Sequence, residues 1–95
     1  MPKLKKNKDL KEHQKWNSHY KKSNNGDKLK TLLGDRMRTI RKQRGYTQEE
    51  LSFRCDLDKT YVASIEQGRR NVSFINLHKI ANALGMTLSE FFKGL

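Results

Sequence analysis

The chain has 95 residues, which is enough for one small domain and a short additional segment. Apolar residues make up 34% and charged residues 33%, so any core must be compact, and no stretch approaches the roughly 18 apolar residues that a membrane span requires. The net charge of +11 favours a polyanionic partner, nucleic acid first and an acidic membrane or protein next, although a basic surface can also serve solubility alone.

Several classes of protein are not expected from the remaining composition. The N-terminus MPKLKKNKDLKEHQ has no apolar stretch after its lysines and does not predict a secretory signal. The single cysteine, Cys55, excludes an internal disulfide and is expected to be a small buried group. The three histidines share no ligand spacing, so no metal site is predicted. We expect a cytoplasmic protein.

Residues 1–27 differ in character from the rest of the chain. They contain eight lysines, three acids and few apolar side chains, and they end in SNNGD, which is typical of a linker. We predict a flexible basic arm over residues 1–27, with a transient helix around residues 9–21, and a folded domain over residues 28–95.

The first helix of the domain is predicted from apolar periodicity. Leu29, Leu33, Met37 and Ile40 recur at helical spacing. Gly45 is placed to end this helix in a left-handed C-terminal cap.

Capping signals divide the following residues into further helices. Thr47 and Glu50 have the capping-box spacing that begins a second helix. Asp58 can cap a third helix, and Gly68 can end it.

Two more helices are predicted near the C-terminus. Ser73 can begin a fourth helix that Gly85 closes, and Thr87 with Glu90 forms a second capping box that opens the last helix. The apolar positions on these two helices are Leu77, Ile80, Ala81 and Leu84, then Leu88, Phe91 and Phe92. The sequence therefore predicts an all-α domain of five helices with short connections and no strand.

The junction CDLD separates two short helices that can share one core. Ser52 is small where the second helix must cross closely, and Asp56 occupies a turn where the backbone needs a positive φ, which Asp tolerates better than most residues. The apolar sites on either side are Leu51, Cys55, Leu57, Val62 and Ile65.

This pattern resembles the helix-turn-helix of phage Cro and repressor proteins, the xenobiotic-response-element family, over roughly residues 29–95. The resemblance implies a compact five-helix, lambda-repressor-like DNA-binding domain whose helix at about 58–67 lies in the major groove of double-stranded DNA. Family members often have Ala where Ser52 stands and Gly where Asp56 stands, and both differences are mild.

The polar face of that helix has a role in this family, because its N-terminal residues lie nearest the base edges. Lys59 can donate to guanine O6 and N7, and Thr60 can meet a thymine methyl group or form a hydrogen bond. Tyr61 lies at the edge of the core and can pack, reach a phosphate or touch a base. Ser64 belongs to the same polar face. Asp58 is expected to cap the helix rather than read a base.

The string LDKTYVASIEQGRRNVS is similar to that of the controller proteins of bacterial restriction–modification systems. This resemblance implies that Lys59, Thr60 and Tyr61 do most of the base and groove work. It also implies phosphate contacts from the start of the first motif helix and from the basic loop, namely from Gln48, Arg69, Arg70 and Asn71. The compact controllers do not need a basic arm such as residues 1–27.

The resemblance further implies a homodimer on a roughly palindromic operator, with control of its own gene and of an endonuclease gene. Two half-sites would lie about 34 Å apart on one face of the DNA. We expect the dimer to form through the two C-terminal helices, because their apolar residues exceed what one narrow face accommodates. The expected contacts are Leu88, Phe91 and Phe92.

An acid near the DNA-binding surface must be neutralised, since it would repel phosphate. We therefore expect Glu66 to pair with Arg36 or Arg69. Of the basic residues on the first helix, one or two are expected to touch DNA and the others to be solvated. These residues are Arg36, Arg38, Arg41 and Lys42.

No feature indicates an enzyme: we find no paired carboxylates near a plausible pocket, no nucleophile–base pair and no phosphate loop. No cofactor or small-molecule ligand is predicted. The leading hypothesis is a sequence-specific transcription regulator in the bacterial cytoplasm, associated with the nucleoid. The alternatives are a phage-like repressor, an antitoxin or other protein-interaction module with the same fold, and a nonspecific nucleic-acid binder. The polar recognition face together with Arg70 and Asn71 favours the regulator.

Overall fold

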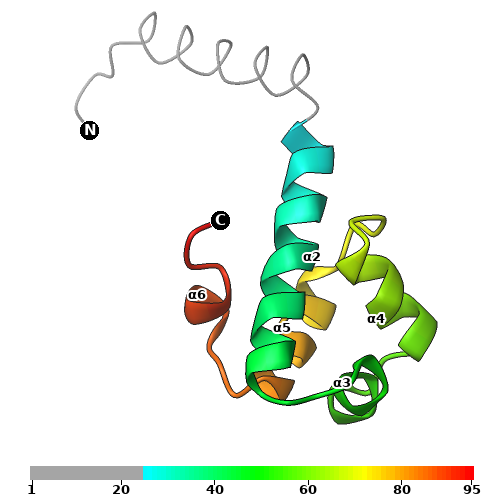
Figure 1. The fold of residues 1–95 in the computed structure, drawn as a ribbon. Coiled ribbons are helices and arrows are strands. Elements are labelled where there is room, and N and C mark those ends of the chain that lie inside the picture. Colours follow the sequence, from blue (N-terminus) through cyan, green and yellow to red (C-terminus); the bar gives the residue numbers. More distant parts are fainter. Residues whose placement is uncertain (1–24) are drawn as a thin grey trace, which may run out of the picture.

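The computed structural model describes residues 25–95, which form five helices and no strand (Figure 1). The long helix α2 runs beside the shorter helices and packs directly against α4. Helix α3 packs against both α4 and α5, and α5 also packs against α6. The predicted all-α fold is confirmed. The helices are α2 (Asn25–Gln43), α3 (Gln48–Cys55), α4 (Lys59–Glu66), α5 (Phe74–Ala83) and α6 (Leu88–Phe91).

The beginning of the domain differs from the prediction. Helix α2 starts at Asn25, so the last residues of SNNGD are helical rather than a linker. Asp27 lies in the first turn of α2, where a negative charge interacts favourably with the helix dipole. Residues 1–24, which include most of the predicted arm and its transient helix, lie outside the described part of the chain. Leu29 is 44% exposed, so the first of the four apolar positions does not belong to the core.

The predicted caps are all present. The Thr47 hydroxyl accepts a hydrogen bond from the Glu50 backbone N–H at 3.0 Å, and the Glu50 carboxylate accepts one from the Thr47 N–H at 3.0 Å. Thr87 and Glu90 repeat this capping box at the start of α6. Asp58 and Ser73 accept from backbone N–H groups two and three residues ahead and begin α4 and α5. Helix boundaries here follow from local chemistry.

The turn between α3 and α4 has the predicted backbone conformation. Asp56 has φ 56° and ψ 46°, which is left-handed, and it is the single non-glycine residue with positive φ between residues 25 and 95. Its N–H closes α3 through the carbonyl of Phe53. This reversal directs α4 across α3, so that both helices contribute to one core.

Changing Asp56 tests this turn. We expect Asp56→Val to lower the free energy of unfolding by about 1–2 kcal/mol, because a β-branched side chain is disfavoured in the left-handed region. Asp56→Gly is the matched control, and it should be at least as stable as the parent because glycine adopts this conformation without a steric cost. Urea denaturation followed by circular dichroism measures both variants. Equal stability of the two variants would contradict the argument.

The core lies where the five helices meet. Its fully buried members come from every one of the five helices, and the largest are Phe91, Met37, Ile40, Leu51, Ile65, Ile80, Leu84 and Val62. Cys55 is also buried, as predicted, and burial raises the pKa of its thiol, which keeps it protonated.

Helix α2 crosses α4 at very short range, and a glycine makes this possible. A Cβ atom on Gly34 would lie 2.5 Å from the carbonyl oxygen of Ile65 and 2.8 Å from that of Glu66. Both are backbone atoms, which cannot turn aside as a side chain does. Gly34 therefore sets the distance between α2 and the C-terminal end of α4.

Candidate nucleic-acid interface

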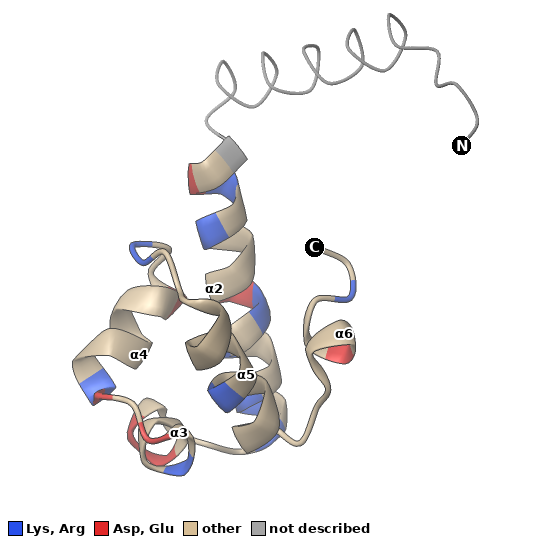
Figure 2. Ribbon diagram, turned by 180° about the vertical axis from the view of Figure 1, so that it is seen from behind, with Lys and Arg blue, Asp and Glu red and all other residues tan. Residues whose placement is uncertain are grey.

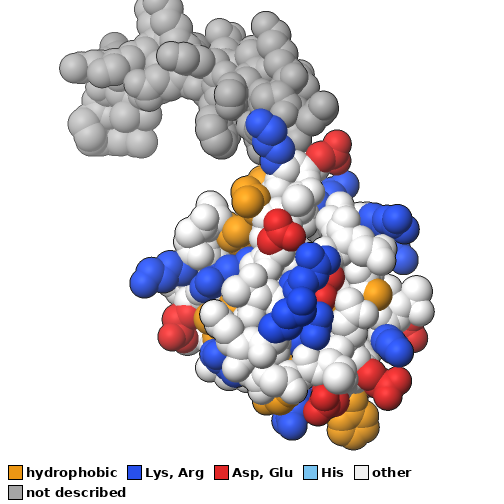
Figure 3. Space-filling model, in the orientation of Figure 1, with side chains coloured by type: hydrophobic (Ala, Val, Ile, Leu, Met, Phe, Trp, Pro, Cys, Tyr) orange, Lys and Arg blue, Asp and Glu red, His pale blue; other side chains and the backbone are white. Residues whose placement is uncertain are grey.

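The outer face of α4 presents the predicted polar residues to solvent. Lys59 and Thr60 are exposed in the first turn, while Val62 and Ile65 are buried on the opposite face. Basic residues lie at both ends of α4, at its first turn and in the loop that follows it (Figure 2). The face between them carries few hydrophobic side chains (Figure 3). Such a surface can approach a polyanion along its whole length.

Lys59 forms a weak ion pair that leaves its ammonium group available for another acceptor. Its Nζ lies 3.6 Å from a carboxylate oxygen of Glu49, and the two side chains are 60% and 77% exposed. An exposed ion pair of this kind contributes roughly 0–1 kcal/mol. Lys59 can therefore exchange Glu49 for an acceptor on DNA at little energetic cost.

The loop after α4 is held against the helix by Arg70. Its Nε donates to the Ser64 hydroxyl at 2.9 Å, and its guanidinium carbon lies 5.5 Å from the centroid of the Tyr61 ring. The Tyr61 hydroxyl accepts from Asn76 of α5 at 3.2 Å, and Tyr61 is half-buried against the core. Three of the predicted DNA-contact residues thus form one connected cluster, in which Tyr61 packs while Arg70 remains exposed.

A surface hollow is lined by residues from both predicted sets, those expected to contact bases and those expected to contact phosphates. It lies along α4 and the following loop, beside Asn71, which is exposed. Its lining combines small and polar side chains with two arginines, which suits an anionic ligand. The lining residues are Thr60, Ala63, Ser64, Gln67, Arg69 and Arg70.

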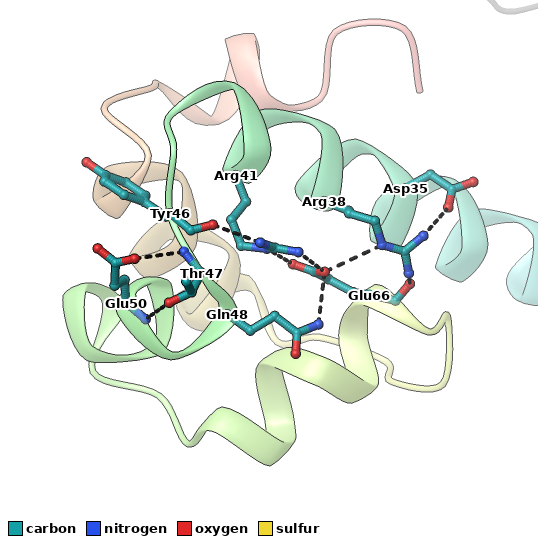
Figure 4. Close-up of polar contacts among 8 residues, drawn as sticks. All are labelled: Asp35, Arg38, Arg41, Tyr46, Thr47, Gln48, Glu50 and Glu66. Atoms are coloured by element: carbon teal, nitrogen blue, oxygen red, sulfur yellow. Dashed lines mark hydrogen bonds and ion pairs between the residues drawn. The ribbon is translucent and has the colours of Figure 1, made fainter.

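Glu66 is neutralised, but by neither of the arginines that we expected. Its carboxylate is fully buried and accepts two hydrogen bonds from Arg41, from Nε at 2.7 Å and from Nη2 at 2.9 Å (Figure 4). Arg38 adds a longer contact of 3.6 Å. The predicted pairing with Arg36 or Arg69 is wrong. Gly34, Arg38 and Arg41 are spaced so that they share the face of α2 that meets the end of α4, whereas Arg36 donates to carbonyls of α6.

Gln48, predicted to contact phosphate, belongs to the same group of side chains. Its Nε2 donates to Oε1 of Glu66 at 3.1 Å (Figure 4). A surface hollow next to Gln48 is lined by Arg41, Thr47, Gln48, Glu49 and Lys59, so this amide lies near solvent as well as near the buried acid.

The charge state of the Glu66–Arg41 pair follows from its surroundings. Burial by itself raises the pKa of Glu66, but the hydrogen bonds from Arg41 and Gln48 and the charges of Arg41 and Arg38 outweigh burial and lower it below the ordinary value. The pKa of Arg41 is raised in turn, mainly by its hydrogen bond to Glu66. The pair is therefore ionised at neutral pH.

The other arginines of α2, and Arg44 directly after it, also have structural partners that sequence reasoning missed. Arg36 donates to the carbonyls of Phe91 and Glu90 at 2.9 and 2.8 Å. Arg38 donates to the Glu66 carbonyl at 2.9 Å, and Arg44 donates to the Leu84 carbonyl at 3.0 Å. Each bond satisfies a carbonyl at the C-terminal end of another helix, where positive charge is favourable. Arg36 and Arg38 were expected to be solvated or to touch DNA, and no role was predicted for Arg44.

The predicted dimer residues have different environments. Phe91 is fully buried, so it packs within its own domain and offers no surface to a second copy. Leu88 is half-buried, and Phe92 is 36% exposed. The structure also exposes Phe74 and Ile75 at the start of α5, by 67% and 65%. Sequence reasoning missed these two, although adjacent apolar residues directly after an N-cap were a usable signal.

An open apolar groove lies next to Phe92. It runs between the first half of α2, the loop after α4 and the C-terminal end of the chain. Its apolar lining residues are Leu29, Leu33, Val72, Leu77, Phe92 and Leu95.

The part of the chain that the structure describes offers neither a metal-binding cluster nor a membrane-spanning helix. Between residues 25 and 95, no three or more His, Cys, Asp or Glu side chains come together in a way that would hold a metal ion. None of the helices in this range combines the length and the apolar character that crossing a membrane requires.

Known proteins resemble this chain in both sequence and fold. The sequence profile of the helix-turn-helix family matches residues 37–91. The control protein C.MunI of Mycoplasma sp. is 44% identical over 68 residues, which cover 70% of this chain and 92% of that protein. The restriction-modification controller protein C.AhdI of Aeromonas hydrophila has a structure that matches with a TM-score of 0.65 at 41% identity, covering 66% of this chain and 96% of that one.

A third similar protein has been solved with DNA. The restriction-modification controller protein C.Esp1396I, as a tetramer in complex with its natural 35 base-pair operator, matches with a TM-score of 0.65 at 32% identity. The match covers 68% of this chain and 86% of that one.

Proposed function

The chain belongs to the helix-turn-helix family of DNA-binding transcription regulators, and from this premise we propose that it binds a two-fold symmetric operator as a homodimer. We further propose that it controls its own gene together with a neighbouring restriction endonuclease gene, as a restriction–modification controller. The similarity to C.MunI and C.AhdI over most of their lengths supports this assignment.

One observation carries the DNA-binding part of the proposal. The exposed first turn of α4, with Lys59 and Thr60, is continuous through a shallow hollow with the basic loop that carries Arg69 and Arg70. Base-reading and phosphate-binding groups therefore lie on one surface, as recognition of a duplex requires. A module for protein interaction alone has no need of that combination.

The dimer is supported by energetics and by exposed apolar surface. A helix of eight residues reads only a few base pairs, and two half-sites about 34 Å apart multiply the discrimination. Exposed apolar side chains at Phe74, Ile75, Phe92 and Leu95 are available for contact with a second copy. We assign Phe92 and the apolar groove beside it to the dimer interface.

Selection of bound DNA from a random pool tests the function directly. We expect a two-fold symmetric consensus with half-sites about one helical turn apart. Recovery of unrelated sequences with equal affinity would instead indicate a nonspecific binder. An operator upstream of this gene, next to endonuclease and methylase genes, would support the controller role, and its absence there would reject that role.

Substitutions on the recognition surface should separate base reading from phosphate binding. We expect Lys59→Ala and Thr60→Ala each to cost about 1–3 kcal/mol of operator binding and to relax base preference at one position of the half-site. Arg70→Ala should weaken binding to operator and random DNA alike and reduce the salt dependence. Titrations on both DNAs at two salt concentrations measure this. Equal losses on both DNAs for the Lys59 and Thr60 variants would reject direct readout.

Substitution of Phe92 tests the proposed dimer interface. We expect Phe92→Arg to shift the protein toward monomer, because a charge would have to be buried in an apolar contact. Phe53→Arg is the matched control, since Phe53 is 88% exposed on α3 and does not line the groove. Sedimentation velocity measures both variants. A dimer that persists in Phe92→Arg, or is lost equally in Phe53→Arg, would refute this interface.

A further inference from the structure

The N-terminal end of α3 and the C-terminal end of α4 are joined by a single side-chain hydrogen bond. Gln48 is the first residue of α3, and Glu66 is the last residue of α4. The bond between the Gln48 amide nitrogen and Glu66 Oε1 is 3.1 Å long (Figure 4). It connects Gln48, which is expected to contact the DNA backbone, with α4, the helix proposed to read the bases.

The acceptor in this bond is held firmly. The Glu66 side chain is completely inaccessible to solvent, and Arg41 contacts both of its oxygens at 2.7 and 2.9 Å. Arg38 adds a contact to Oε1 at 3.6 Å and binds the Glu66 carbonyl at 2.9 Å. Arg41 is itself fixed, because its Nη1 donates to the Tyr46 carbonyl at 2.8 Å. Glu66 therefore has little freedom to follow a moving partner.

The chemistry of the two groups determines which way the Gln48 amide faces. An ionised carboxylate only accepts hydrogen bonds, so the NH₂ group of the amide must face Glu66 and its oxygen must face away. One of the two Nε2 hydrogens is then used by Glu66. The other remains, beside a surface hollow that Gln48 shares with Lys59. A phosphate also only accepts, so this second hydrogen is the one that Gln48 can offer to DNA.

We propose that Glu66 is a positioning residue for DNA binding, which acts by orienting the Gln48 amide so that its nitrogen bridges the buried carboxylate and a DNA phosphate. The proposal deepens the proposed function and rests on it for the phosphate contact. The amide separates two anions that would otherwise repel, and its conformation is set before DNA arrives. Binding then avoids much of the entropy loss of ordering a long polar side chain.

The side-chain amide of Gln48 in the free, full-length wild-type protein provides the first test. We expect its heteronuclear NOE in solution NMR to be close to that of the backbone, whereas the amide of Gln43, exposed at the end of α2, should be mobile. Glu66→Gln should make the Gln48 amide mobile or reorient it. A Gln48 amide as mobile as that of Gln43 in the wild type would overturn the proposal, and this readout remains decisive if Glu66→Gln does not fold.

Operator binding provides the second test, through the variants Gln48→Ala, Glu66→Gln and the double variant. We expect each single variant to lose on the order of tenfold in affinity, and the double variant to lose little more than Gln48→Ala alone. A merely structural role of Glu66 would produce the same loss with and without Gln48, and that result would overturn the proposal. Binding of Gln48→Ala at wild-type affinity would also overturn it.

The two tests distinguish failure of this inference from failure of the proposed function. A wild-type protein without operator preference contradicts the function, while the NMR readout still decides whether Glu66 orients Gln48. A mobile Gln48 amide in a protein that binds its operator normally overturns the inference and leaves the function in place.

Discussion

The Glu66→Ala variant is expected to lose about 3–5 kcal/mol of unfolding free energy, because it leaves Arg41 buried without a counter-charge. Arg41 is only 8% exposed, and of its three hydrogen bonds only the one to the Tyr46 carbonyl would remain. The loss is a large fraction of the stability of a small domain. Chemical denaturation followed by circular dichroism measures it.

A double variant serves as the control for this prediction. In Arg41→Met/Glu66→Leu both charges are replaced by apolar groups of similar size, so no uncompensated charge is buried. We expect this protein to recover most of the loss, because the desolvation cost of a buried ion pair offsets much of its attraction. A double variant as unstable as Glu66→Ala would contradict the unpaired-charge explanation and indicate a packing defect instead.

The same pair predicts how stability depends on pH. The pKa of Glu66 in the folded protein lies below its ordinary value of 4.5, since Arg41, Gln48 and Arg38 together outweigh the effect of burial. A carboxyl whose pKa is lowered by folding contributes stability that is present above the unfolded pKa and is lost as pH falls through the folded one. Stability should therefore fall from about pH 4.5 downward. The double variant without Glu66 and Arg41 should show a shallower acid limb.

Replacing Gly34 with alanine is the second substitution with a large expected effect. In an exposed helix interior this change stabilises by about 0.5–1 kcal/mol. Here the new Cβ would lie 2.5 and 2.8 Å from two backbone carbonyl oxygens at the end of α4, so the two helices must separate. We expect a loss of at least about 2 kcal/mol in the free energy of unfolding. Operator affinity should fall as well, because α4 carries the proposed recognition surface.

Gly26→Ala is a matched control within the same helix. A Cβ at Gly26 meets nothing within 4 Å, and its backbone φ is ordinary for a helix. We expect this variant to be as stable as the parent or slightly more stable. Thermal unfolding of the two variants side by side measures the difference. A Gly34→Ala protein that is as stable as Gly26→Ala would show that α2 and α4 can separate without cost.

Much of this structure was predictable because the interactions that determine it join residues only a few positions apart in the sequence. The Thr47–Glu50 capping box joins residues three apart, and it forms whenever those residue types have that spacing. The positive φ at Asp56 follows from a turn between two helices whose apolar residues must face one core. The exposure of Lys59 and Thr60 was predictable for the same reason, since they lie opposite the buried Val62 and Ile65 on one helix.

Only the tertiary structure decided which of several equivalent residues makes each distant contact. Helix α2 carries three arginines, Arg36, Arg38 and Arg41. The choice of Arg41 over Arg36 as the partner of Glu66 depends on how α2 is rotated and on how closely Gly34 lets it approach α4. Phe91 and Phe92 are neighbours with the same chemistry, yet the position of α6 buries the first and exposes the second. Periodicity fixes the residues that share a face, whereas the crossing angle and distance of two helices emerge only when all of the faces pack together.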